Sequence, residues 1–369
     1  MKKELNILHI SPYFNYVCGV SKYVYLVLKE LKKLSDSDLK LNLHFITNGG
    51  DGLNRLLAAG IKPTLFTFKK GLINLVYLKN NIIQLEDFCL NNDIDVIHTH
   101  HRYPELLSSI IQKRIFSKTG KKIKTITTAH SIVKGYRSIS FQSDKIIAVS
   151  NTIKKYLIDN YRIAEEKIIQ QFNPVDRLNN KVKEKIGRNK YGIPDESKII
   201  LYVGRFSNEK GIKVLLKAFS EIVKHKNVFL MMISDANEKE QKKIISRNSK
   251  IIFIKPCDDI TEYYQLTDIV VVPSLIESSL PYAAIESASN KKLLITSNIE
   301  VMKEFIEHNK HAIMFETDNH RALINAIYQA INMSEEKKHV MTENLYSLIN
   351  MFDNPKNYAN KLLSIYINL

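Results

Sequence analysis

Residues 269–286 read Ile269-Val-Val-Val-Pro-Ser-Leu-Ile-Glu-Ser-Ser-Leu-Pro-Tyr-Ala-Ala-Ile-Glu286: an apolar run, a polar loop and a helix start. The uniformly apolar run over 269–272 is typical of a buried parallel strand. Pro281 predicts the helix start, because proline is preorganised for a first helical turn. A helix N-terminus that follows a strand offers free backbone N–H groups to an anion. With carboxylates at Glu277 and Glu286, the pattern favours an anionic ligand that carries hydroxyl groups, and a nucleotide sugar has both properties.

Strand-like and helix-like segments alternate on both sides of this stretch. The predicted strands lie at 5–10, 41–45, 64–68, 95–98, 123–128, 145–149, 199–203, 228–233, 251–254, 269–272 and 293–296. This alternation predicts an α/β protein with parallel sheets covered by helices on both faces. In such sheets ligands bind beyond the carboxyl ends of the strands, so the functional residues are expected in the loops that follow them.

The composition of the chain changes between Asn173 and Lys198, where a polar, Lys- and Asn-rich connection runs to Gly192 before the alternation restarts. A length of 369 residues also favours two domains over one. We expect a Rossmann-like domain over residues 1–175 and a second over 176–350, which face each other across a cleft. A C-terminal helix over 351–369 is expected to pack back on the first domain.

Composition and charge narrow the setting of the protein. The three cysteines, Cys18, Cys89 and Cys257, show neither metal-site nor disulfide spacing, which favours a reducing compartment. No signal peptide and no membrane-spanning run is recognisable, so a cytoplasmic location is expected. The net charge of +16 reflects either compositional drift or attraction to an anionic membrane surface at the inner leaflet. Because the lysines are scattered, nucleic-acid binding is not expected.

The loop after the 199–203 strand reads Gly204-Arg205-Phe-Ser-Asn-Glu-Lys210-Gly211. Arg205 offers a rigid fork of donors and Lys210 a mobile point charge, a complementary pair for a diphosphate. The alternative is two solvated cations beside a loop. The helix start that follows Gly211 favours the phosphate interpretation.

Glycine and histidine residues mark two further loops. Gly19 opens a second strand-to-helix turn that could admit a phosphate, although a single glycine is a weak signal and by itself an ordinary turn glycine is the better explanation. His130 follows a strand and could hydrogen-bond a sugar hydroxyl or a leaving phosphate, whereas a lone histidine is more often structural. His98, His100 and His101 cluster in the sequence, but no fourth ligand is evident, so no metal site is predicted.

These motifs follow one another in a recognisable order. They are Gly19-Val20, Asp95–His100, Thr128–His130, Asp144–Ser150, Asn173–Asp176, Val203–Arg205, Glu209–Gly211, Asp268–Ser274, Glu277–Glu286 and Ser297–Glu304. In these segments, over nearly its whole length, the chain resembles the retaining glycosyltransferases of family 4, which have the GT-B architecture.

The resemblance implies retaining transfer of a sugar from a nucleoside diphosphate donor, with a UDP-sugar expected and no metal ion. Arg205 and Lys210 would stabilise the departing diphosphate. Glu286 would bind the ribose, and His130 would contact the sugar near the reacting carbon. The other implied donor contacts are Gly19, Glu277 with the backbone at Ser278, Ser279 and Leu280, and Pro256 and Cys257 beside the base.

The acceptor implied is a glycan, a lipid-linked molecule or a protein, in bacterial surface polysaccharide or glycoconjugate synthesis. Loops at 14–18, 69–75 and 101–103 are expected to select it. The sequence also departs from the family: eight residues separate Glu277 from Glu286 instead of seven, and Cys18, Ser234, Ala236 and 300–301 replace glycines. A second hypothesis therefore stays open, a non-catalytic GT-B-like subunit that binds acceptor and supports a partner glycosyltransferase.

Overall fold

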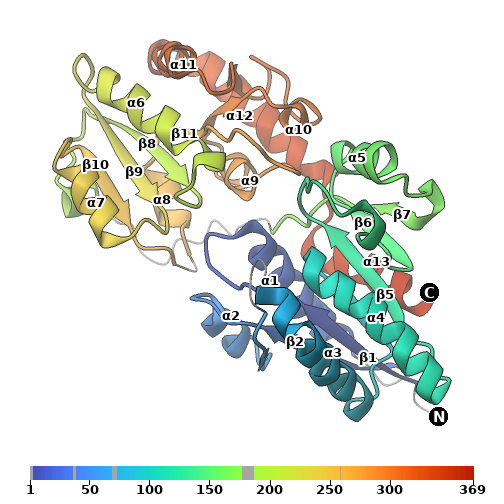
Figure 1. Ribbon diagram of the computed structural model, residues 1–369. Coiled ribbons are helices and arrows are strands. Elements are labelled where there is room, and N and C mark those ends of the chain that lie inside the picture. The colour runs from blue at the N-terminus through green and yellow to red at the C-terminus, as the bar shows by residue number, and fades with distance from the viewer. Residues whose placement is uncertain (1–2, 36–38, 69–72, 177–186, 258) are drawn as a thin grey trace. The chain divides into compact units, whose positions relative to one another are not determined.

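The computed structural model describes residues 3–35, 39–68, 73–176, 187–257 and 259–369, with only the backbone of residues 3 and 73–76. Residues 69–72 of the acceptor loop expected at 69–75 and residues 177–186 of the polar connection lie outside the described residues, whereas residues 73–75 are the start of a helix. The chain forms two compact units (Figure 1). Unit 1 consists of Met1–Pro174 and Asp353–Leu369, and unit 2 of Val175–Phe352.

Unit 1 is built on a seven-stranded parallel sheet in the order β3-β2-β1-β4-β5-β6-β7. The strands are β1 (Lys3–Ile10), β2 (Leu39–Thr47), β3 (Thr64–Leu65), β4 (Val96–Thr99), β5 (Lys124–Ala129), β6 (Lys145–Ala148) and β7 (Ile168–Gln170). The central strand β4 is buried along its whole length, as expected when helices cover both faces of a parallel sheet. The strand predicted at 64–68 is only two residues long, and the pattern did not predict β7.

Helices pack on both faces of this sheet. They are α1 (Gly19–Leu31), α2 (Leu53–Ala58), α3 (Ile73–Asn91), α4 (Arg102–Thr119), α5 (Asn151–Tyr161) and α13 (Pro355–Ile367). The C-terminal helix α13 buries Tyr358, Leu362 and Tyr366 in the same apolar cluster as Val24 and Leu28 of α1. The last residues of the chain therefore complete the core of the N-terminal unit.

Unit 2 repeats the architecture with six parallel strands in the order β10-β9-β8-β11-β12-β13. The strands are β8 (Lys198–Val203), β9 (Val228–Ile233), β10 (Ile251–Ile254), β11 (Ile269–Val272), β12 (Leu293–Ser297) and β13 (Ile313–Phe315). The helices are α6 (Ile212–Ile222), α7 (Glu238–Ile245), α8 (Thr261–Leu266), α9 (Tyr282–Ser289), α10 (Glu300–Lys303), α11 (His320–Asn332) and α12 (Glu335–Leu348). The apolar run at 269–272 is indeed a buried strand, β11.

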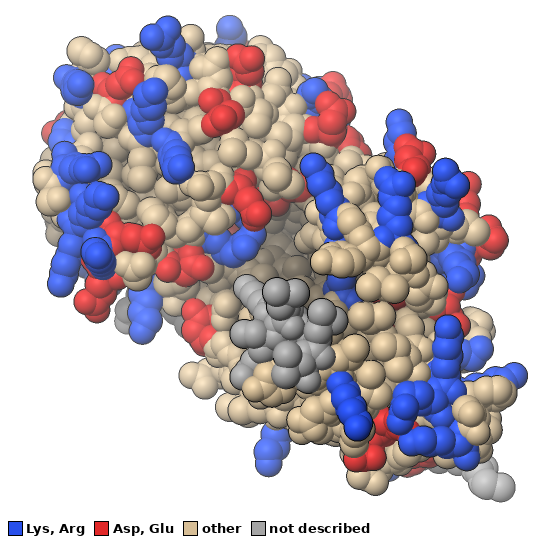
Figure 2. All heavy atoms as spheres, in the orientation of Figure 1, with Lys and Arg blue, Asp and Glu red and all other residues tan. Residues whose placement is uncertain are grey.

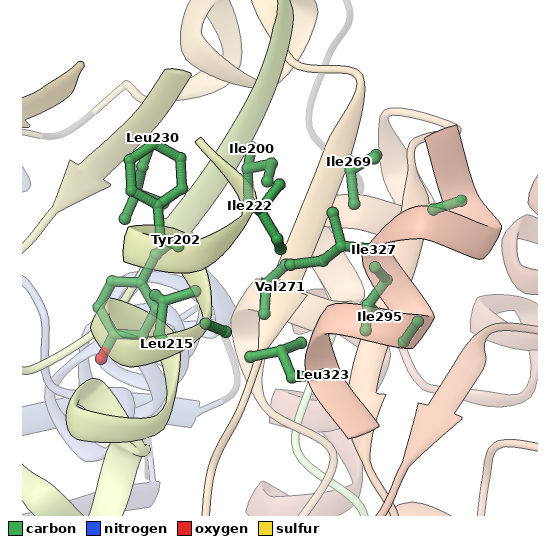
Figure 3. Close-up of a cluster of buried hydrophobic side chains, with 14 of the residues drawn as sticks. Ile200, Tyr202, Leu215, Ile222, Leu230, Ile269, Val271, Ile295, Leu323 and Ile327 are labelled. Carbon is green, nitrogen blue, oxygen red and sulfur yellow. The ribbon is translucent and has the colours of Figure 1, made fainter. Parts of the chain in front are cut away.

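The core of unit 2 lies between its sheet and the helices α6 and α11 (Figure 3). Ile200 and Val271 of neighbouring strands meet Leu215 of α6 and Leu323 of α11, and all four are buried. These side chains share one face because helical residues at a spacing of about 3.6 lie on the same side of the helix. Along a strand, every second side chain points to the same face of the sheet. Packing of this kind fixes where each strand ends and thus where the following loop begins.

The strand order of each sheet reverses once. In unit 2 the chain proceeds from β8 outward to β10 and then crosses back to β11, which pairs with β8. In unit 1 the corresponding neighbours are β1 and β4. The connections diverge at such a switch point, and the carboxyl ends there are the usual ligand sites of open α/β sheets. None of the helices in the described ranges has the length and apolar character needed to cross a bilayer.

Candidate active site

The loop after β8 and the loop after β11 are joined at the switch point of unit 2. Glu209 accepts a backbone hydrogen bond from Leu275 N at 2.8 Å. Gly211 has φ +72°, and a Cβ atom added to it would lie 1.9 Å from the carbonyl oxygen of Pro273. Only glycine tolerates both this backbone conformation and this close approach. The two stretches predicted to bind an anion are therefore in direct contact.

Lys210 and Glu277 form an ion pair between these loops. Lys210 Nζ lies 2.5 Å from Glu277 Oε1, and the side chains are only 21% and 11% exposed. Ser274 Oγ donates to the same carboxylate oxygen at 2.6 Å. The structure thus places a partly buried cation and a carboxylate together at the carboxyl ends of β8 and β11, where a diphosphate and a sugar could each take one partner.

Arg205 lies in the same loop but is more exposed. Its guanidinium contacts Glu209 Oε2 at 3.3 Å, and 45% of its side chain faces solvent. The loop backbone around it is held firmly: the Tyr202 hydroxyl donates to Arg205 O at 2.6 Å, and Phe206 N donates to Asp235 Oδ1 at 2.5 Å. Arg205 is therefore a solvent-facing cation on a fixed loop, available to an anion that enters beside Lys210.

Glu286 lies on α9 and is 5% exposed. It accepts a hydrogen bond from the hydroxyl of Tyr264, at 2.7 Å. Burial raises the pKa of Tyr264 well above its usual value, and the charge of Glu286 adds to the shift. Tyr264 comes from α8, a short helix that sequence reasoning missed because six residues give no clear period.

The remaining predicted donor contacts also follow strands of unit 2. Ser278 and Leu280 are buried in the loop that leads to α9, whose N-cap is Pro281. Pro256 and Cys257 lie in the loop after β10, with one residue between the end of the strand and Pro256, and are partly buried. Their loops thus leave the same edge of the sheet as the loops that carry Lys210 and Glu277.

Two buried hydroxyl groups at this edge were not predicted from the sequence to contact a ligand. Among the described residues, Ser207 Oγ and Ser234 Oγ have no hydrogen-bond partner. Ser207 lies in the loop of Arg205 and Lys210, and Ser234 follows β9, where the family pattern has a glycine. Buried polar atoms are nearly always satisfied, so both are candidate ligand contacts.

The predicted residues Gly19 and His130 belong to unit 1. Gly19 is the first residue of α1 and is exposed. His130 follows β5 and is partly buried; its Nε2 lies 3.2 Å from His100 Nδ1. Burial lowers the pKa of His130 to about 3, so the ring is neutral at neutral pH.

His9, His98 and His100 form the group in the described part of the chain that could hold a metal ion, with one nitrogen of each within 4.8 Å of the others. Parallel pairing of β1 with β4 puts His9 beside His98, whereas the sequence had suggested His101 as the third member. In the described residues, the ring nitrogens of these three histidines hydrogen-bond to each other, to His130, to Tyr366 and to Thr128. A metal ion would have to displace these bonds, so hydrogen bonding accounts for the cluster.

Known proteins show the same architecture and sequence features. Residues 183–347 match the family model described as glycosyl transferases group 1, and residues 17–177 match the one described as Glycosyltransferase Family 4. Lipopolysaccharide 1,2-N-acetylglucosaminetransferase of Salmonella typhimurium is 25% identical over 228 residues, which cover 56% of this chain and 57% of that protein. The chain spans about half the length of the curated relatives it matches.

Solved structures align over almost the whole chain. A glycosyltransferase from Rickettsia africae has a TM-score of 0.78 over 98% of each chain at 24% identity. HepE of Anabaena, solved in complex with UDP-glucose, has a TM-score of 0.82 over 99% of this chain and 100% of its own, at 14% identity. The predicted fold class and the predicted family are both confirmed. With two parallel sheets, and with a family match in each half, the chain belongs to the glycosyltransferases of family 4 and has the GT-B fold.

Proposed function

We propose that the protein is a retaining glycosyltransferase that takes a sugar from a nucleoside diphosphate donor without a metal ion. The observation that carries this proposal is the Lys210–Glu277 pair at the switch point of unit 2. A diphosphate needs a cation that is sheltered from water, and a donor sugar needs a carboxylate that accepts from its hydroxyls. The loop after β8 supplies the cation, Lys210, and the loop after β11 supplies the carboxylate, Glu277.

In the proposed reaction the bond between the anomeric carbon and the diphosphate breaks, and a bond to an acceptor oxygen forms on the same face. The proton of the acceptor hydroxyl passes to the departing diphosphate. Lys210 and Arg205 stabilise the negative charge that develops on the departing diphosphate. Glu277 and the loop N–H groups at 278–280 hold the sugar, and Glu286 holds the ribose. In this scheme unit 2 binds the donor and unit 1 binds the acceptor, and the role proposed for His130 is contact with the sugar.

The relatives support the choice of donor and acceptor. HepE of Anabaena was solved with UDP-glucose, which favours a UDP-sugar as the donor here. The Salmonella relative is named for lipopolysaccharide, which favours a glycan or lipid-linked acceptor in surface polysaccharide or glycoconjugate synthesis. A protein acceptor is the third member of this class.

Calorimetric titration with UDP-, GDP- and ADP-sugars tests the proposal. The wild-type chain is expected to bind one of them, and Lys210→Ala to weaken that binding about 10- to 100-fold, because a charge-assisted hydrogen bond contributes about 1.5–3 kcal/mol. Lys213→Ala, an exposed lysine one turn further along, is the matched control and is expected to bind normally. If no donor binds, and the chain copurifies with an active glycosyltransferase, the non-catalytic subunit hypothesis replaces this one.

We also propose that the acceptor is reached at an anionic membrane surface, on the inner leaflet. The net charge of +16 supports this, and Figure 2 shows Lys and Arg side chains spread over the visible face with acidic residues among them. Attraction of this kind weakens as salt screens it. Cosedimentation with vesicles that contain phosphatidylserine, at low and high salt, tests it against vesicles of neutral lipid.

A further inference from the structure

A chain of buried hydrogen bonds in unit 1 ends at His130. His130 Nε2 meets His100 Nδ1 at 3.2 Å, and His100 Nε2 meets His9 Nδ1 at 3.1 Å. His9 Nε2 then meets the hydroxyl of Tyr366 at 3.1 Å, and the same hydroxyl meets His98 Nδ1 at 2.6 Å. These residues lie in β1, β4 and α13 or in the loops directly after β4 and β5.

The chain continues beyond the histidines into a series of hydroxyl groups. His98 Nε2 meets Thr128 Oγ1 at 2.7 Å, and Thr128 Oγ1 meets the hydroxyl of Tyr23 at 3.3 Å. The hydroxyl of Tyr23 in turn meets that of Tyr358 at 2.8 Å. Apart from His130, every member has at most 3% of its surface exposed.

Burial keeps the histidines of this chain neutral. It lowers the pKa of His9 to about 3 and the pKa values of His98 and His100 well below the usual value. A neutral imidazole has one nitrogen that donates and one that accepts. Three imidazoles in a row must therefore all donate in the same direction, and the direction at His9 decides which nitrogen of His130 carries the proton.

Tyr366 sets that direction because it lies between His9 and His98. If its hydroxyl accepted from both histidines, its own proton would lack an acceptor among the described residues, at a cost of about 1–3 kcal/mol in a buried site. Tyr366 therefore accepts from one imidazole and donates to the other. The whole run from His98 to His130 is then ordered one way.

We propose that Tyr366, His9, His98 and His100 are positioning residues that fix His130 as a neutral imidazole with its proton on Nδ1. In this arrangement Tyr366 donates to His9, His9 to His100, and His100 to His130 Nε2. His130 Nδ1–H is then left to donate, and the described residues of unit 1 give it no hydrogen-bond partner. This inference rests on the proposed function, in which a donor sugar and a diphosphate supply acceptor oxygens; phosphate oxygens cannot donate.

Two tyrosines of α13 make a matched pair for the test. Tyr366→Phe removes the hydroxyl that joins His9 to His98. Tyr358→Phe removes an equally buried hydroxyl from the same helix. This hydroxyl is at the end of the hydrogen-bond chain that is remote from His130, so every hydrogen bond between His130 and Thr128 remains. Nitrogen-15 NMR of the histidine rings in the full chain, with His130 assigned by His130→Gln, reads the tautomer without any substrate.

The expected result is an Nδ1-protonated His130 in the wild type and in Tyr358→Phe, and a mixture of tautomers in Tyr366→Phe. Transfer from the donor is expected to lose about tenfold in kcat/KM in Tyr366→Phe, as for one lost hydrogen bond. An Nε2-protonated or charged His130 in the wild type, or equal changes in the two variants, overturns the inference. If Tyr366→Phe does not fold, Thr128→Val breaks the chain at His98 and is expected to shift the His130 tautomer in the same way.

Donor titration separates this inference from the proposed function. Donor binding together with an Nε2-protonated His130 refutes the positioning chain and leaves the transferase proposal standing. An Nδ1-protonated His130 with no donor binding refutes the proposed function. It also refutes the proposed role of the hydrogen-bonded residues in positioning His130 for the donor.

Discussion

Replacing Gly211 by alanine should damage the junction between the loops after β8 and β11. Gly211 has φ 72° and ψ 22°, where an L-residue costs about 1–2 kcal/mol. The added Cβ atom would lie 1.9 Å from Pro273 O, so the loops must also separate, which costs about 1–3 kcal/mol more, as in an overpacked core. We expect unit 2 to lose about 2–5 kcal/mol in its free energy of unfolding.

Gly192→Ala is the control. The backbone conformation of Gly192 is nearly the same as that of Gly211, but the space around an added Cβ atom is open. Gly192 has φ 63° and ψ 30°, and no atom lies within 4 Å of an added Cβ. Its variant should lose only the backbone cost of about 1–2 kcal/mol. Urea denaturation followed by circular dichroism measures both losses, and calorimetry measures donor binding, which should weaken in Gly211→Ala alone. Equal losses in the two variants would refute the argument that the contact with Pro273 requires glycine.

Three further predictions concern charges and buried polar groups. A double-mutant cycle with Lys210→Ala and Glu277→Ala should give a coupling energy of about 1 kcal/mol in the unliganded chain; additive losses would contradict the ion pair. Glu105→Ala should cost unit 1 about 3 kcal/mol by urea denaturation, because its carboxylate accepts from three backbone N–H groups at 141–143; a loss below about 1 kcal/mol would contradict this. The folded pKa of His9, about 3, lies below its unfolded value, so its contribution to stability is complete above pH 6.5 and declines as the pH falls toward 3. The free energy of unfolding should therefore be about 2 kcal/mol lower at pH 5 than at pH 7. A melting temperature that stays constant between pH 7 and pH 5 would refute this prediction.

The parallel sheets were predictable because their central strands are uniformly apolar. The run at 269–272 and the strand at 199–203 needed no information beyond their own residues, and β11 and β8 lie where they were expected. By contrast, β7 and β13 are three residues each, too short to show a period, and they were missed. Pro281 was expected inside the first turn of α9 and is its N-cap, a difference of one position.

Parts of the candidate site followed from the order of strands, and parts did not. Loops after β8 and β11 could be paired because parallel strands end at one edge of a sheet. The contact of Tyr264 with Glu286 depends on a short helix, α8, that has no clear pattern. The bond between His9 and Tyr366 spans 357 residues, and no local periodicity records such a separation.

The position of α13 bears on how the chain folds during synthesis. Unit 2 is one continuous segment, Val175–Phe352, whereas unit 1 needs Tyr358 and Tyr366 from the last helix to close its core. A ribosome releases the N-terminal segment first, yet that segment must wait until α13 has been synthesised before it can bury α1 against α13. Domains usually fold in the order in which they are synthesised. Here unit 2, which is synthesised second, can complete its fold before unit 1 does. Until then the apolar face of α1 lacks the cover that α13 provides, and hydrophobic surface exposed in this way favours aggregation during folding.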